Sequence, residues 1–165
     1  MTSAFAVTGA GTDACPLSFS SGPLRVALDT NVLVSLWIFS DSRLAPLRHA
    51  LEDGRWRALT NAACAGEFAR VLAYPQFGVA PERQHSALAE YRALAEDVPA
   101  AGPEADPLPR CADRDDQKFL ELARDGRADW LVTADKALLR LARRQKLAHL
   151  FRILTPDAAL ATLTG

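Results

Sequence analysis

The sequence predicts an α/β domain built around a mainly parallel sheet, and three observations support this fold class. Short apolar runs of strand length alternate along the chain with longer segments whose apolar residues recur at helical spacing. Strands of a parallel sheet need such helical crossovers, and strands buried on both faces are continuously apolar. The 165 residues, of which 49% are hydrophobic, are enough for one globular core.

The N-terminal stretch and the first half of the domain divide at residue 22. Residues 1–22 are small and polar, and we expect a loosely ordered extension there, with a single domain over 23–165. The expected strands of the first half cover 24–28 and 55–61. The expected helices cover 31–39, 43–53, 62–74 and 81 to about 97. Gly54 ends the second helix, Pro75 stops the third and Pro81 starts the fourth.

The second half continues the alternation. Residues 98–114 contain four prolines and are expected to form a loop, or a short strand and a loop, without a domain boundary. Strands are expected at 128–135 and 151–155. Helices are expected at 115–126, at 136–145 and from Pro156 onward.

Charge and composition exclude some classes of function and leave others open. The net charge of −1 gives no global basic field, although a local patch of arginine can still bind nucleic acid. A late basic cluster is either a solvated helix end or an RNA-contacting patch. That cluster comprises Arg140, Arg143, Arg144 and Lys146.

The cysteines and histidines do not follow a metal-binding or disulfide pattern. Cys15, Cys64 and Cys111 are odd in number and widely spaced, which is typical of a protein in a reducing compartment. The three histidines are isolated, so a histidine-based metal site is not expected. No stretch has the roughly 20 apolar residues of a membrane span, and the N-terminus does not resemble a signal peptide. We therefore expect a cytoplasmic protein without a membrane partner.

Four acidic residues are placed where a sheet-edge site would need them. Asp29 ends the first predicted strand in "RVALDTN", and Asp135 ends the strand in "WLVTAD". If these strands are parallel neighbours, both carboxylates reach the same edge. Asp116 starts a helix and shares its apolar stripe, and Glu67 lies at the margin of the apolar stripe of its own helix.

Each acid also has a purely structural interpretation. Asp29, Asp116 and Asp135 are placed to cap the helices that follow them, and Glu67 could pair with Arg70. Taken together, the four carboxylates would repel one another unless a cation lies among them. Oxygen ligands without cysteine or histidine favour Mg²⁺ or Mn²⁺, and such ions assist the hydrolysis of phosphodiesters.

Four segments in order resemble the PIN-domain nucleases, and most closely the bacterial members that are toxins of toxin–antitoxin pairs. The segments are "LDTNVLVS", "GEFARVL", "DDQKFLELA" and "LVTAD", and the resemblance spans about residues 24–160. It implies a three-layer α/β/α sandwich and a cytoplasmic ribonuclease that uses Mg²⁺ or Mn²⁺. It also implies a small antitoxin protein as partner, and a homodimer as in many relatives.

The resemblance assigns the catalytic and metal-binding residues. The family's acidic cluster maps onto Asp29, Glu67, Asp116 and Asp135, with Asp29, Asp135 and Asp116 as the main metal ligands. Glu67 would hold a metal-bound water or a second cation. The small polar residues of the family map onto Thr30, Asn31 and Thr133, and Thr133 or Asn31 would orient a carboxylate.

The chain departs from the family's pattern at two places. Ala134 stands where many relatives have glycine before the last acid. Asp113 and Asp115 lie beside Asp116, and we choose Asp116 for the third acid because Phe119 and Leu120 follow it at helical spacing.

Three other functions are open at this point. A non-catalytic RNA-binding or protein-binding module would bind without cleaving. A receiver-like signalling domain would also gather acids around Mg²⁺, but it needs a pair of adjacent acids after the first strand, where Asp29 stands alone. The segment "TGAGTD" is a weak match to a dinucleotide-binding loop because it lacks a preceding strand and a third glycine in register.

Overall fold

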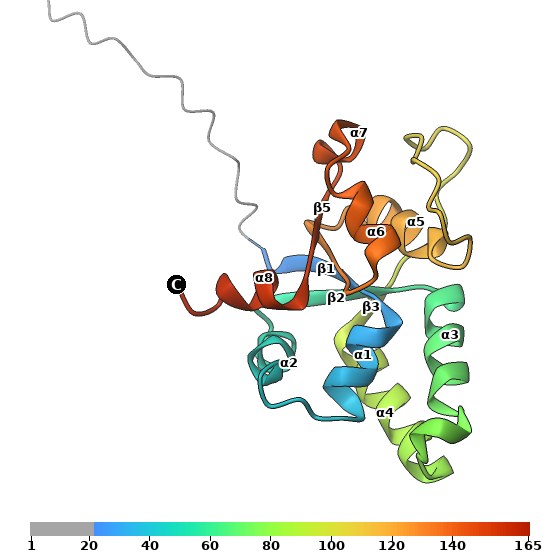
Figure 1. The fold of residues 1–165 in the computed structure, drawn as a ribbon, viewed down its shortest axis with the longest axis vertical. Helices are drawn as coiled ribbons and strands as arrows, with labels where there is room; N and C mark the ends of the chain where they lie inside the picture. Colours follow the sequence, from blue (N-terminus) through green and yellow to red (C-terminus); the bar gives the residue numbers. More distant parts are fainter. Residues whose placement is uncertain (1–21) are drawn as a thin grey trace, which may run out of the picture.

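Five parallel strands form the central sheet in the order β3-β2-β1-β4-β5, which confirms the predicted fold class (Figure 1). The computed structural model describes residues 22–165. The extension expected over residues 1–22 therefore lies outside the described residues, except for Gly22. The strands are β1 (Leu24–Leu28), β2 (Trp56–Thr60), β3 (Ala95–Asp97), β4 (Trp130–Val132) and β5 (Arg152–Leu154).

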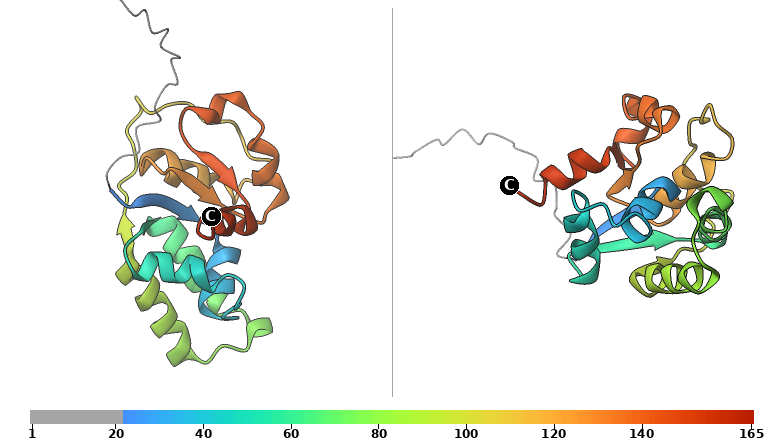
Figure 2. Two further views of the ribbon diagram at one scale, coloured as in Figure 1. Left: turned by 90° about the vertical axis from the view of Figure 1, so that its left-hand side faces the viewer. Right: turned by 60° about the horizontal axis from the view of Figure 1, so that its bottom comes forward.

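Helices connect and cover the strands on both faces. They are α1 (Thr30–Trp37), α2 (Ala45–Glu52), α3 (Ala62–Leu72), α4 (Pro81–Leu94), α5 (Gln117–Asp125), α6 (Lys136–Leu141), α7 (Gln145–Ala148) and α8 (Pro156–Ala161), with a 3₁₀ turn η1 (Pro75–Phe77). Figure 2 shows α5 and α6 on one side of the sheet and α1, α2 and α4 on the other. The molecule is therefore a three-layer α/β/α sandwich, as the resemblance implied.

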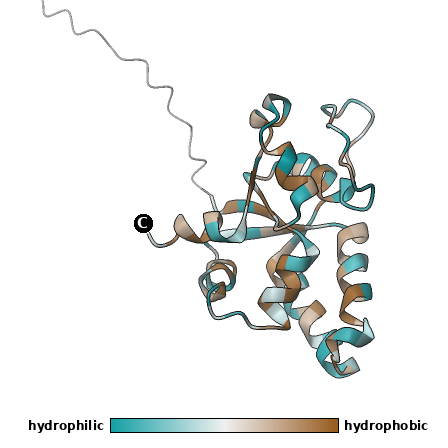
Figure 3. Cartoon of the chain, in the orientation of Figure 1, coloured by the Kyte–Doolittle hydropathy of each residue, from teal (hydrophilic) through white to brown (hydrophobic). Residues whose placement is uncertain are grey.

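The strands are buried on both faces, as their continuous apolar runs predicted. Val26 and Leu28 of β1 face the layer that contains α1, α2 and α4, whereas Ala27 between them faces the layer that contains α5 and α6. Leu59 of β2 and Leu131 of β4 face the same side as Ala27. Figure 3 shows hydrophobic residues concentrated along these strands. Two hydrophobic clusters, one on each face, thus hold the sheet between its helices.

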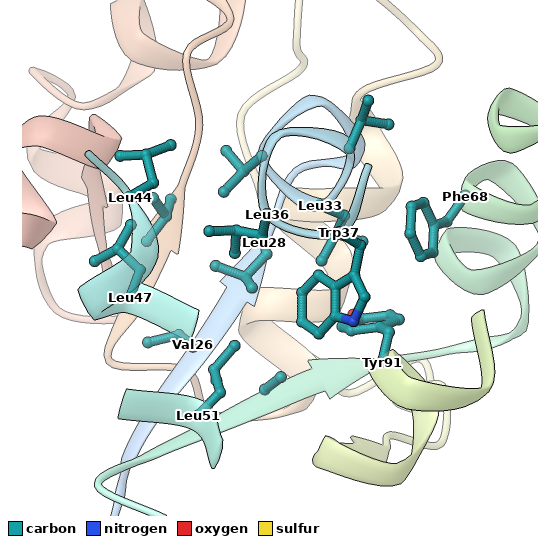
Figure 4. Packing of buried hydrophobic residues seen from close by; sticks show 14 of the residues in the cluster. Val26, Leu28, Leu33, Leu36, Trp37, Leu44, Leu47, Leu51, Phe68 and Tyr91 are labelled. Carbon is teal, nitrogen blue, oxygen red and sulfur yellow. The ribbon is translucent and has the colours of Figure 1, made fainter. Parts of the chain in front are cut away.

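The larger cluster fixes α1, which begins next to Asp29. Trp37 at the end of α1 is fully buried and packs edge-to-face against Tyr91 of α4, with 5.5 Å between ring centroids. Phe68 of α3 also packs edge-to-face against Tyr91, with 5.6 Å between ring centroids (Figure 4). These three aromatic side chains join α1, α3 and α4 into one rigid layer.

Three sequence expectations about element boundaries are wrong. The strand expected over 128–135 covers only Trp130–Val132, so that Asp135 follows β4 by three positions instead of ending it. The helix expected from Pro81 to about Asp97 ends at Leu94, and residues 95–97 form the edge strand β3 paired with β2. The helix expected over 136–145 is interrupted, so that α6 and α7 are separate. In contrast, Gly54 has the expected left-handed conformation (φ 80°) after α2, which favours glycine.

No helix among residues 22–165 is both long enough and apolar enough to span a membrane.

Candidate active site

The carboxyl ends of β1 and β4 form the edge of the sheet where the predicted acids meet. β1 and β4 are parallel neighbours, with Leu28 opposite Val132. Asp29 directly follows β1, and its backbone N–H donates to the carbonyl of Val132 at 3.0 Å. The strand order reverses at β1, because β2 lies on one side of it and β4 on the other. This is the position at which open parallel sheets form their binding sites.

Asp29 is a buried carboxylate that accepts hydrogen bonds from two neighbours. It is only 3% exposed, and its Oδ2 accepts a hydrogen bond from the hydroxyl of Thr133 at 2.7 Å. Its Oδ1 accepts a longer one from the backbone N–H of Asn31 at 3.4 Å, which caps α1. Thr133 Oγ1 in turn accepts from the backbone N–H of Asp135 at 2.9 Å. Thr133 therefore connects the two acidic segments through its hydroxyl.

Burial dominates the ionisation of Asp29. Removal from water raises the pKa of the Asp29 carboxyl, and the hydrogen bond from Thr133 partly opposes this rise. Asn31 contributes its backbone N–H rather than its side chain to this site. Thr30 is buried beside Asp29, and its hydroxyl has no hydrogen-bond partner among the described residues.

Asp135 combines a capping contact with its place at the edge. Its Oδ1 accepts hydrogen bonds from the backbone N–H groups of Ala137 at 2.7 Å and Leu138 at 3.3 Å, which caps α6. The capping interpretation is therefore correct for Asp29 and Asp135. Capping a helix does not exclude these carboxylates from a metal site, because both caps are formed at the same edge of the sheet.

Asp116 is different, because its carboxylate caps nothing. It precedes α5 without a side-chain capping hydrogen bond, and its Oδ2 is buried with no hydrogen-bond partner among the described residues. Burial, followed by the charge of Asp135, raises the pKa of Asp116 to about 7; Asp29, Asp113 and Glu67 add to the rise. Asp113 and Asp115 are exposed, so Asp116 alone of these three neighbours is drawn into the protein.

Glu67 approaches the cluster from α3 and is paired with a residue that the sequence reasoning did not single out. Its Oε2 forms an ion pair with the ammonium of Lys118 on α5, not with Arg70. Both side chains are mostly buried, with exposures of 19% for Glu67 and 18% for Lys118. Lys118 lies two residues after Asp116 in the segment that carried the family resemblance, which is the one signal in the sequence that could have found it.

The chemistry of these side chains fits a hard divalent cation. Only oxygen atoms are available as metal ligands from the side chains of Asp29, Glu67, Asp116 and Asp135. The buried Oδ2 of Asp116 accepts no hydrogen bond from the described residues. Among the described residues, however, no three acidic, histidine or cysteine side chains already have their donor atoms arranged around a single ion. Ligation would therefore require side-chain rearrangement at this edge.

The raised pKa of Asp116 gives a pH-dependent prediction. Because the folded-state pKa lies near 7 and above the ordinary value of 3.8, Asp116 favours folding at low pH, and this benefit is lost as pH rises from about 4 to about 7. The variant D116N has no ionisable group at this position, so its stability does not fall with pH for this reason. Without divalent ions, we expect the Tm of D116N relative to the original chain to rise by about 2–4 °C between pH 4 and pH 8.

The control for this prediction is D115N, which alters the exposed neighbour of Asp116. Thermal unfolding followed by circular dichroism at several pH values measures both variants. A difference in Tm between D116N and the original chain that does not change with pH would contradict the assigned environment of Asp116.

The fold and its edge define a parallel α/β domain with an acidic site at the topological switch point of the sheet. The family model for the PIN domain matches residues 25–137, which is more than half of the chain and contains all four acids. The chain belongs to the PIN domain family. PIN domains are generally nucleases that cleave RNA, and they generally bind divalent metal ions.

A comparison with solved structures aligns the chain with the PIN domain of RRP44 from T. brucei. The two share 14% sequence identity, the alignment covers 94% of this chain and 92% of that chain, and the TM-score is 0.42. A comparison with curated proteins found no match.

Proposed function

We propose that this chain is a ribonuclease that hydrolyses RNA phosphodiester bonds with Mg²⁺ or Mn²⁺. The observation that carries the proposal is the acidic edge: buried Asp29 after β1, Asp135 after β4, and Asp116 with an unpartnered buried oxygen. The family supports the activity, because PIN domains are generally nucleases. We further propose that residues 23–165 act as one domain, because β5 lies beyond the matched range and still pairs with β4.

In this proposal, Asp29, Asp116 and Asp135 hold the cation and Glu67 contributes from α3. A divalent cation would supply a more acidic bound water and neutralise charge on the phosphate. The chain's own contribution is to fix the carboxylates. Thr133 holds Asp29 through its hydroxyl and holds the Asp135 segment through the backbone N–H of Asp135. Such orienting contacts tune the affinity of a site for metal.

The test is cleavage of a mixed RNA substrate by the purified chain in Mg²⁺, in Mn²⁺ and in EDTA. We expect cleavage in at least one of the two metals and none in EDTA. Equal cleavage in EDTA would refute metal dependence. Metal-independent binding of RNA without cleavage would instead favour a non-catalytic RNA-binding module.

A basic groove next to the acidic edge is suited to the RNA backbone. Lys136 follows Asp135 directly, and Lys136, Arg140 and Arg143 line a groove of about 440 Å³ together with Leu139. All three basic side chains are exposed, and none is ion-paired with an acid within residues 22–165. This arrangement supports the interpretation of the late basic cluster as an RNA-contacting patch.

The salt dependence of RNA binding tests that groove. In a D29N background, which keeps the RNA intact, the triple variant K136Q/R140Q/R143Q should bind RNA more weakly. The slope of log K against log salt should fall in magnitude by about 2, because each phosphate contact on a single strand contributes about 0.7. Fluorescence anisotropy at several salt concentrations measures this slope.

The matched control for the groove is R57Q/R127Q/R152Q. It removes the same charge from positions at or before the amino ends of β2, β4 and β5, at the opposite edge of the sheet. If the control changes the salt slope as much as the groove variant does, the groove is not the RNA-binding surface.

We also propose that the chain is the toxin of a toxin–antitoxin pair and acts on RNA in the cytoplasm. The support is the likeness of its four motif segments to such toxins, together with the buried thiols of Cys64 and Cys111, which are not joined in a disulfide. Induced expression in a bacterial host should arrest growth, and D29N at equal abundance should not. A small antitoxin protein is the partner expected to relieve the arrest, and unimpaired growth would contradict this role.

A further inference from the structure

Lys118 places a positive charge beside Glu67, one of the four acids of the candidate site. It lies on the first turn of α5, and its ammonium pairs with Glu67 of α3, so that the pair connects two helices on either side of the site. The ammonium also lies 5.6 Å from the centre of the Phe119 ring, which belongs to the buried hydrophobic cluster beneath α5. Lys118 is therefore held on two sides and is not a freely moving surface lysine.

The burial of this ion pair determines how strongly Lys118 and Glu67 attract each other. Surface ion pairs contribute little because water screens them, but Lys118 and Glu67 are each more than four-fifths buried. Reduced screening therefore makes the attraction between the Lys118 ammonium and the Glu67 carboxylate stronger than that of an exposed pair. The acids of the site also repel one another, since Asp135, Asp29 and Glu67 all raise the pKa of Asp116.

We propose that Lys118 is a built-in counter-ion of the acidic site, which pairs with Glu67 and thereby limits how tightly the site takes a divalent cation. This inference rests on the proposed function, because it assumes that the acids bind the cation. Lys118 is a positioning residue: it occupies Glu67 and offsets one negative charge. Without that ammonium, Glu67 is free to turn to the cation and the site is one charge more negative.

The proposal predicts opposite effects on metal affinity and on stability without metal. We expect K118M to bind Mn²⁺ roughly 10-fold more tightly, because an ammonium no longer opposes the ion at short range. K118M should also have a lower Tm in EDTA, since the carboxylates repel without their counter-ion. In saturating Mn²⁺ its Tm should return to that of the original chain. A merely structural role for Lys118 would lower the Tm in both conditions.

The experiment measures Mn²⁺ binding to the full chain by electron paramagnetic resonance, together with Tm in EDTA and in Mn²⁺. K118R keeps the charge and should keep the affinity within about 3-fold of the original. R57M removes a positive charge at an exposed position near the amino end of β2 and should leave the Mn²⁺ affinity unchanged. In an E67Q background, K118M should raise the affinity by less than it does in the original chain, because the charge of the ammonium is removed but there is no longer a Glu67 carboxylate to release.

The outcomes separate this inference from the proposed function. If the original chain binds no Mn²⁺, the proposed metal site fails and the inference fails with it. If the original chain binds Mn²⁺ and K118M binds it equally or more weakly, the role of Lys118 is refuted and the metal site stands. K118Q is measured beside K118M. If K118M does not fold, the Mn²⁺ affinity of K118Q tests the role of Lys118 by the same criteria.

Discussion

Replacing Asp29 with asparagine is expected to reduce metal-dependent RNA cleavage by about 100-fold or more while the fold persists. Loss of a contact that merely orients a metal ligand typically costs 10–100-fold, and D29N removes a proposed ligand itself. Asparagine has nearly the same shape and can still accept the hydrogen bond from Thr133. It also removes a charge that burial disfavours at this position. The fold is therefore expected to be as stable in D29N as in the original chain.

The measurement compares initial rates of cleavage in Mg²⁺ and Mn²⁺ with thermal unfolding of the same samples. D157N is the matched control, because Asp157 is an exposed acid on α8 that has no part in the candidate site. It should cleave at the original rate. Full activity of folded D29N would remove Asp29 from the site, whereas an unfolded D29N would make D116N the variant that decides.

The largest expected effect on stability comes from replacing Trp37 with alanine. Trp37 is fully buried, packs edge-to-face on Tyr91, and lies under the guanidinium of Arg48 at 5.0 Å. Truncating a buried tryptophan costs about 3–5 kcal/mol of unfolding free energy, which corresponds to a fall in Tm of about 6–20 °C here. The indole N–H has no hydrogen-bond partner among the described residues, so the loss is one of packing.

W37F is the control for this prediction, since it keeps an aromatic ring against Tyr91 and should cost clearly less than W37A. Chemical and thermal unfolding measure both variants. Because Trp37 anchors the helix that begins after Asp29, W37A should also lose activity at temperatures where it begins to unfold. A Tm within about 2 °C of the original would show that this aromatic cluster does not carry the stability assigned to it.

The alternation of apolar runs and amphipathic segments was enough to predict the parallel sheet and the placement of Asp29 and Asp135 at one edge. Strands buried on both faces and acids within three residues of their ends are local patterns, and they are readable in a single sequence. The sequence did not decide whether Asp29 caps a helix or belongs to a functional site. The structure uses the same carboxylate for a cap and for the contact with Thr133.

Other features depended on contacts between distant segments. Residues 95–97 continue a helical pattern and have poor strand propensity, yet they form β3 because β2 offers a free edge to pair with. The ion pair between Glu67 and Lys118 depends on how α3 packs against α5, so the sequence suggested the nearer Arg70 instead. The unpartnered oxygen of Asp116 likewise follows from burial, which no local pattern reports.

We propose that Asp29, Asp116 and Asp135 hold a divalent cation at the carboxyl edge of the sheet. Anomalous X-ray scattering from crystals grown with Mn²⁺ locates the ion directly. We expect an anomalous peak within bonding distance of carboxylate oxygens of these acids, and loss of that peak in D29N. A Mn²⁺ ion bound only elsewhere on the chain, with these carboxylates unliganded at saturating Mn²⁺, would contradict it.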